Sequence, residues 1–211
     1  MFRDRLSTMS TSDKFRDSFL KKTNEYRKRH RAKPLTLSSD LCEGCQTWAN
    51  ILATQKQLKH SSAGKTRKTD TGENLYYIGT TDDLFQLKGS AAVKAWYNEI
   101  KHYKFKDSED QIMQKFNKVG HFTQLVWKET KNVGVAMAEN NGIFVVVAQY
   151  EPAGNLVGSF KMNVKDKKEK SSSSVSEFQG SSSSDENENI SSSAAAGRDI
   201  GNHDDHIRRW V

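Results

Sequence analysis

The sequence contains few cysteines. Only Cys42 and Cys45 occur among the 211 residues, with two residues between them. Secreted disulfide scaffolds usually carry more, so the count favours a reducing compartment. A zinc site needs about four ligands, and no second C-x-x-C or nearby histidine pair completes one. A redox C-x-x-C lies at a strand-to-helix turn, whereas this pair falls inside a helical pattern. We therefore predict core or helix-surface cysteines.

Long apolar runs are absent as well. No segment approaches the ~18 apolar residues of a membrane span, and the opening stretch, MFRDRLSTMSTSDKF, has no apolar core typical of a signal peptide. Residue 2 is phenylalanine, so the N-myristoylation pattern that begins with glycine is missing. These features favour an intracellular protein, and the missing glycine argues against an N-myristoyl anchor.

Positive charge is in excess, with a formal net charge of +7. From Lys167 onward there are 6 Lys and Arg against 8 Asp and Glu, which leaves +9 for Met1 to Asp166. Such a basic region attracts anionic lipid, nucleic acid or glycosaminoglycan, although the interspersed acids equally fit a solvated basic face. The densest cluster, Arg27 to Arg31, is predicted at a helix end, where cations need no partner. Aromatics follow core periodicity rather than a basic stripe, so we expect no nucleic-acid partner.

Apolar residues recur with helical spacing in three segments, which predicts helices at about residues 13–30, about 40–58 and from 90 onward. Ser12, Asp40 and Ser90 are the candidate N-terminal caps. We predict exposed loops for the polar segments 59–71, 82–89 and 104–118.

After Thr130 the apolar period changes to two. Asn141-Gly142 is a strong hairpin signal, and the return strand, Ile143 to Tyr150, is nearly all apolar and therefore predicted in the middle of a sheet. Helices followed by an antiparallel pair predict an α+β layered domain. The predicted organisation is a flexible leader at 1–11, one domain at 12–164 and a disordered Ser-rich tail at 165–211.

One stretch stands out, GHFTQLVWKET at Gly120 to Thr130, which holds His121 in a short helix or tight turn packed inside the fold. It resembles the first signature of the CAP superfamily, which includes cysteine-rich secretory proteins, antigen 5 and plant pathogenesis-related proteins. VVVAQYEPAGNL resembles the second signature, except that Ala148 stands where cysteine is usual. The similarity runs from about Phe15 to Phe160, and segments such as LKHSS, GENL and WYNEI resemble the intracellular, Golgi-associated branch of the family.

The resemblance implies a three-layer α-β-α sandwich with a central antiparallel sheet and a cleft lined by His60, Glu73, Glu99 and His121. Neutral imidazoles are good ligands for Zn²⁺ or Cu²⁺, and carboxylates orient them. Each residue also has a simpler interpretation. Those interpretations are a core histidine at 121, a solvent or ion-pairing Glu99, a loop-capping Glu73 and an exposed His60. We expect the remaining histidines on the surface, with His102 nearest the cleft rim: His30, His102, His203 and His206.

The function that the resemblance implies is non-enzymatic binding of lipid (sterol, fatty acid or anionic phospholipid) or protein partners at a membrane surface, with self-association into a homodimer. The expected location is cytoplasmic or peripheral on Golgi or other endomembranes, with extracellular release by unconventional secretion as the alternative. The competing function is a metal-dependent hydrolase or protease in which Glu73 or Glu99 is the general base. The absence of an HExxH motif weighs against it. A serine nucleophile at Ser61 or Ser62 is weaker still, because adjacency to His60 does not make a hydrogen bond.

Overall fold

The computed structural model describes residues 10–61 and 71–167. Within these ranges, the chain forms six α-helices and four β-strands, with two short 3₁₀ turns at Asn98–His102 and Phe116–Lys118. The elements are α1 (Thr11–Arg29), β1 (Thr36–Leu37), α2 (Ser39–Gln55), β2 (Gly72–Gly79), α3 (Gly89–Tyr97), α4 (Glu109–Gln114), α5 (Gly120–Leu125), β3 (Asn132–Asn140), β4 (Ile143–Glu151) and α6 (Phe160–Asn163).

The strands form one sheet in the order β1-β3-β4-β2. The β3–β4 and β2–β4 pairs are antiparallel, while the two-residue β1 pairs with β3 in parallel. The predicted hairpin is confirmed. Asn141 and Gly142, with φ of 53° and 74°, make the turn between β3 and β4, and only residues that tolerate positive φ fit both central positions of a type I′ turn.

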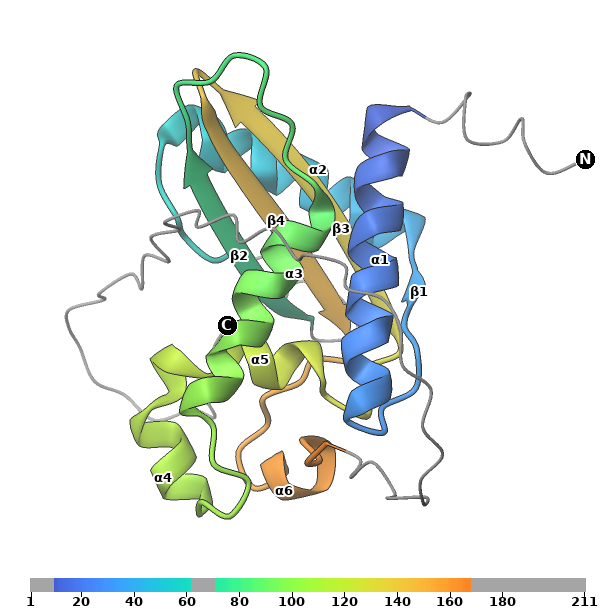
Figure 1. The fold of residues 1–211 in the computed structure, drawn as a ribbon, viewed down its shortest axis with the longest axis vertical. Helices are drawn as coiled ribbons and strands as arrows, with labels where there is room; N and C mark the ends of the chain where they lie inside the picture. The colour runs from blue at the N-terminus through green and yellow to red at the C-terminus, as the bar shows by residue number, and fades with distance from the viewer. Residues whose placement is uncertain (1–9, 62–70, 168–211) are drawn as a thin grey trace, which may run out of the picture.

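Helices cover both faces of the sheet (Figure 1). On one face, Val145 and Val147 of β4 belong to the cluster that α2 buries with Ala49 and Leu52. On the other face the strands pack against α1, α3 and α5 through a larger cluster: Phe19, Trp96, Phe122, Val133, Val135, Val146 and Tyr150. The predicted α-β-α sandwich is therefore confirmed. Both cysteines lie in the core, as predicted.

Several local predictions were wrong. Ser10 rather than Ser12 caps α1, and Ser38 rather than Asp40 caps α2. The loop predicted for 104–118 contains α4, whose Ser108 and Gln111 form a complete capping box. No strand was predicted at Gly72–Gly79, because its buried residues run consecutively and leave no alternation to detect.

The cluster Arg27 to Arg31 is not a uniformly solvated face. Arg27 lies in the last turn of α1, as predicted, but it and His30 are both 0% exposed, which corrects the surface prediction for His30. The Arg27 guanidinium donates to four backbone carbonyls, and His30 lies between Tyr97 and the carbonyl of Lys165. The two residues are three positions apart, so they share the inward face of the helix end.

Other predictions fall outside the described residues. These concern most of the leader, the tail from 168 onward, His203, His206 and Ser62. Among the described residues, no helix is long and apolar enough to cross a membrane.

Candidate functional site

Two histidine–carboxylate pairs bring the four predicted residues together two by two. His60 follows α2, and its Nδ1 lies 3.0 Å from Oε1 of Glu73 on β2. His121 is the second residue of α5, and its Nδ1 lies 2.7 Å from Oε1 of Glu99 in the 3₁₀ turn after α3. A carboxylate only accepts, so each Nδ1 donates and each neutral ring keeps a lone pair on Nε2.

Glu73 is the more deeply held carboxylate, with a side chain only 8% exposed. Besides His60, it accepts hydrogen bonds from the Ser61 N–H, the Ser61 hydroxyl at 2.6 Å and Gln149 Nε2 at 3.1 Å. Burial by itself raises the pKa of this carboxyl, but the hydrogen bonds from His60, Ser61 and Gln149 outweigh it and hold the pKa below the usual value. Glu73 is therefore a fixed anion that orients His60.

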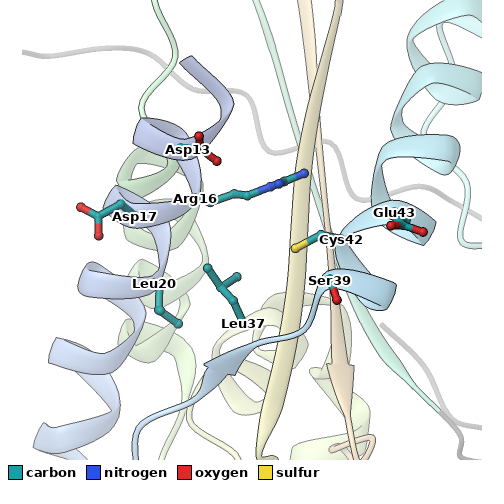
Figure 2. Close-up of a pocket in the computed structure, with 8 residues that line it drawn as sticks. All are labelled: Asp13, Arg16, Asp17, Leu20, Leu37, Ser39, Cys42 and Glu43. Carbon is teal, nitrogen blue, oxygen red and sulfur yellow. The ribbon is translucent and has the colours of Figure 1, made fainter. Parts of the chain in front are cut away.

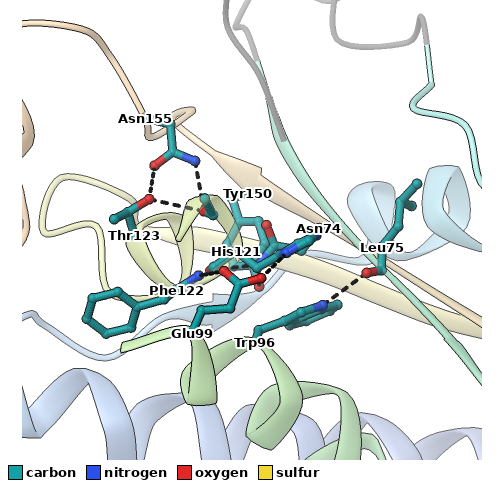
Figure 3. Close-up of polar contacts among 10 residues, drawn as sticks. Asn74, Leu75, Trp96, Glu99, His121, Phe122, Thr123, Tyr150 and Asn155 are labelled. Carbon is teal, nitrogen blue, oxygen red and sulfur yellow. Dashed lines mark hydrogen bonds and ion pairs between the residues drawn. The ribbon is translucent and has the colours of Figure 1, made fainter. Parts of the chain in front are cut away.

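Glu99 holds His121 in a comparable way (Figure 3). Its second oxygen accepts the backbone N–H of Phe122 at 3.1 Å, at the start of α5. The His121 ring is stacked on Trp96 of α3, with ring centroids 6.2 Å apart and planes 12° from parallel. Carboxylate, helix start and indole together fix the position of the ring, so His121 is neither a freely rotating nor a fully buried histidine.

The two pairs approach β2 from opposite layers. The strand residues on the Glu73 side belong to the α2-facing cluster, whereas the next residue, Asn74, points to the α5 side. There Asn74 Nδ2 donates to the carbonyl of His121 at 3.1 Å. Because β2 is an edge strand of the sheet, residues from both layers can reach the same border. Two consecutive residues of β2 thus connect to the two histidines.

Residues 20–150 match the family model described as the cysteine-rich secretory protein family, CAP. The chain belongs to the CAP family. It is 37% identical over 163 residues to human Golgi-associated plant pathogenesis-related protein 1, which covers 76% of this chain and 98% of that protein. It is 35% identical over 125 residues to venom allergen 5 of Dolichovespula arenaria, spanning 57% of this chain and 58% of the allergen. The crystal structure of NaASP2 with Zn²⁺ has a TM-score of 0.55 and 26% identity, covering 74% of this chain and 87% of that one.

The CAP site, which comprises His60, Glu73, Glu99 and His121, offers two imidazole nitrogens as candidate metal ligands. Each histidine is held through Nδ1, which leaves Nε2 as the ligand atom in the arrangement common to metal-binding histidines. The His60 and His121 side chains are 47% and 28% exposed, so both are accessible from solvent. Across the described residues, however, no three His, Cys, Asp or Glu side chains are grouped closely enough to hold an ion. Two imidazoles would have to be supplemented by water or an external ligand.

The same geometry bears on hydrolysis. A general base needs a lone pair directed at the attacking water. Glu73 already accepts four hydrogen bonds, and both oxygens of Glu99 are engaged by His121 and Phe122. The carboxylates of the CAP site are therefore built to position histidines.

Two supporting residues, Asn74 and Trp96, escaped the sequence prediction, and Ser61 was considered only as a nucleophile, whereas it donates to Glu73. Asn74 sits beside Glu73 in the GENL segment, and Trp96 lies three residues before Glu99, so proximity to site residues was the available signal. Gln149 was noted only as part of a family signature, yet the strand register pairs it directly with Glu73. His102 is exposed and belongs to neither histidine–carboxylate pair.

A separate pocket of about 480 Å³ lies between α1 and the start of α2 (Figure 2). Asp13, Asp17 and Glu43 place three carboxylates around it against one cation, Arg16. Cys42 lines its wall, where the sulfur accepts the backbone N–H of Val135 at 3.4 Å. None of the four CAP site residues lines this pocket.

Proposed function

We propose that the chain is a non-enzymatic CAP-domain binding protein that attaches to anionic endomembrane surfaces and holds a divalent metal, Zn²⁺ or Cu²⁺, at His60 and His121. The observation that carries the metal function is the double pairing of histidine with carboxylate. In both pairs the carboxylate occupies Nδ1, and Glu73 uses its other acceptor sites for hydrogen bonds from Ser61 and Gln149. In such a site the carboxylates orient the two imidazoles, and the imidazole Nε2 atoms are free to bind a metal. A bound metal would add Lewis acidity to the site.

Two similarities support this proposal. The structurally similar NaASP2 was crystallised with Zn²⁺, and the human relative is named as Golgi-associated. The described residues contain 23 Lys and Arg against 16 Asp and Glu, so they carry +7. Each basic residue near an anionic membrane contributes about 1 kcal/mol. Attachment at a Golgi or related membrane would therefore be electrostatic and reversible. Sterol or fatty acid as ligand, and self-association, stay predictions.

Calorimetric titration with Zn²⁺ tests the metal function. The wild-type protein is expected to bind, and the His60→Ala, His121→Ala double variant is expected to lose that binding. His102→Ala is the matched control, because His102 is an exposed histidine outside both pairs. Equal Zn²⁺ affinity in the double variant and the wild type would show that the site is elsewhere.

The hydrolase alternative has its own test in the same preparation. Zn²⁺-dependent cleavage of a peptide library, abolished by Glu73→Gln with metal affinity retained, would replace the binding function with catalysis. We expect no such cleavage, because Glu73 has four donors directed at it.

Sedimentation with vesicles tests attachment. The protein is expected to pellet with phosphatidylserine-containing vesicles at low salt, and to be released as salt screens the charges. Equal sedimentation with neutral and anionic vesicles would contradict electrostatic attachment.

A further inference from the structure

Three segments that are distant in the sequence meet at one end of the molecule, where α1 ends beside α6 (Figure 1). One spans the end of α1, one spans the end of α5, and one contains α6. We call this region the α6 end, and it comprises residues 28–33, 125–131 and 157–167.

Hydrogen bonds fasten these segments to one another. Buried Arg27 donates to the carbonyls of Lys33 and Trp127, both at 2.8 Å, and so joins the first two segments. The Lys128 N–H donates to the carbonyl of Asn163 at 3.2 Å, which joins the second to the third. His30 Nδ1 lies 2.6 Å from the Lys165 carbonyl, which joins the first segment to the third. The three segments of the α6 end therefore form one surface held together by hydrogen bonds.

The net charge of the described protein is concentrated on this surface. The α6 end holds nine Lys and Arg against two acids, Glu129 and Asp166, which is +7. The described residues as a whole are also +7, so their other residues sum to zero. Eight of the nine cations are exposed and Lys165 is half-buried. The nine are Lys28, Arg29, Arg31, Lys33, Lys128, Lys131, Lys161, Lys165 and Lys167.

Apolar side chains are exposed among these cations. Met162 on α6 is 67% exposed and Val157, just before it, is 56% exposed. Phe160 between them packs edge-on against buried Trp127, which anchors the turn and leaves Met162 outside. A nucleic-acid backbone or another polyanion uses only the charges. A bilayer interface uses the charges at its phosphates and also accepts the apolar side chains.

We infer that the α6 end is the face that lies on an anionic lipid bilayer, with its lysines and arginines at the headgroup phosphates and Met162 and Val157 entering the interface. This inference rests on the proposed membrane attachment and adds its orientation. Among these cations, Arg29 is tied to a carboxylate on the same helix, Glu25, at 2.6 Å.

The test uses the full chain and vesicles of phosphatidylcholine with about one-third phosphatidylserine. The variant Lys28→Gln, Lys128→Gln, Lys161→Gln removes three charges from the α6 end. The matched control, Lys14→Gln, Lys88→Gln, Lys94→Gln, removes three exposed charges elsewhere. We expect the first triple to lower the partition coefficient by about 100-fold and the control by less than about 5-fold.

Met162→Ser separates a bilayer from other polyanions. It is expected to weaken vesicle binding by severalfold with the salt dependence unchanged, and to leave binding to heparin or duplex DNA unaltered. An equal loss in both triples would overturn the assignment of the face while leaving membrane attachment intact. No sedimentation of the wild-type protein would instead refute the proposed function. Unchanged vesicle binding in Met162→Ser, with heparin binding lost in the first triple, would identify a polyanion site and overturn the inference.

Discussion

Replacing Arg27 by methionine removes a side chain that joins the end of α1 to the segment after α5. The guanidinium is 0% exposed and donates to the carbonyls of Lys33, Leu125, Trp127 and Thr130 at 2.8–3.1 Å. Methionine preserves most of the apolar stem but removes all four of these hydrogen bonds. Two of the acceptors, Leu125 and Trp127, lie at or shortly after the end of α5, the helix that carries His121 of the candidate site.

The magnitude follows from two opposing contributions. Hydrogen bonds to a charged group contribute about 1.5–3 kcal/mol each, so losing four costs at least about 6 kcal/mol. Burial lowers the pKa of Arg27 from 12.5 to about 10, which corresponds to about 3 kcal/mol of solvation that the variant recovers. The free energy of unfolding should therefore fall by about 3 kcal/mol or more. For a domain of this size that is a decrease in Tm of about 6–12 °C.

Urea denaturation followed by circular dichroism measures the change. Arg16→Met is the matched control, because Arg16 lies on the same helix, is half-buried and makes only one long hydrogen bond, 3.4 Å to the Val135 carbonyl. It should cost less than about 1 kcal/mol. If Arg27→Met also lowered the free energy of unfolding by less than about 1 kcal/mol, water would be replacing the guanidinium. That result would refute the stabilising role assigned to Arg27.

Two further variants test the packing and the buried histidine. Burial lowers the pKa of His30 below 6.5, and the hydrogen bond to the Lys165 carbonyl only partly opposes this effect. As the pH falls, the unfolded chain therefore binds the proton before the folded chain does. The free energy of unfolding should be highest above about pH 6.5 and decrease below it. In urea unfolding at about pH 7.5 and 5.5, His30→Phe should reduce this pH dependence, and an undiminished dependence would assign it to other groups. A Cβ on Gly134 would lie 2.3 Å from Leu41 Cβ, so Gly134→Ala should cost about 1–3 kcal/mol by thermal unfolding. Gly79→Ala, where the nearest atom is 3.7 Å away, should be nearly neutral, and equal effects at both positions would contradict the close approach of α2 to β3.

The layered fold was predictable because its signals are local. The helical stripes of α1 and α2 and the Asn141-Gly142 turn are each encoded within a few residues. The strand β2 was missed because Gly72 to Tyr76 are all buried, so neither period appears in the sequence. Its identity as a strand depends on pairing with β4, about 70 residues away, which no local pattern reports.

The candidate site divides in the same way. The family motifs selected the two histidines and two glutamates, but the sequence did not show which glutamate would pair with which histidine. The pairing of Glu73 with His60, and of Glu99 with His121, depends on how α2, β2, α3 and α5 pack. The supporting donors on Ser61, Asn74 and Gln149 become visible only in the folded chain, because their partners lie 12 to 76 residues away.

The pentapeptide Arg27 to Arg31 supports one last prediction, because helical geometry divides it into two functions. Arg27 continues the buried series of Phe19 and Thr23 at intervals of four and locks the core, whereas Lys28, one position further on, is exposed on the α6 end. Arg27→Met and the Lys28-containing triple variant should therefore separate two measurements. The first should lower the urea midpoint, and at temperatures where it stays folded it should bind anionic vesicles nearly as the wild type does. The second should lose vesicle binding with its urea midpoint unchanged. If both variants lowered the urea midpoint and vesicle binding in proportion, the whole basic cluster would have a single structural role. The division between a buried, stabilising Arg27 and a membrane-facing Lys28 would then be wrong.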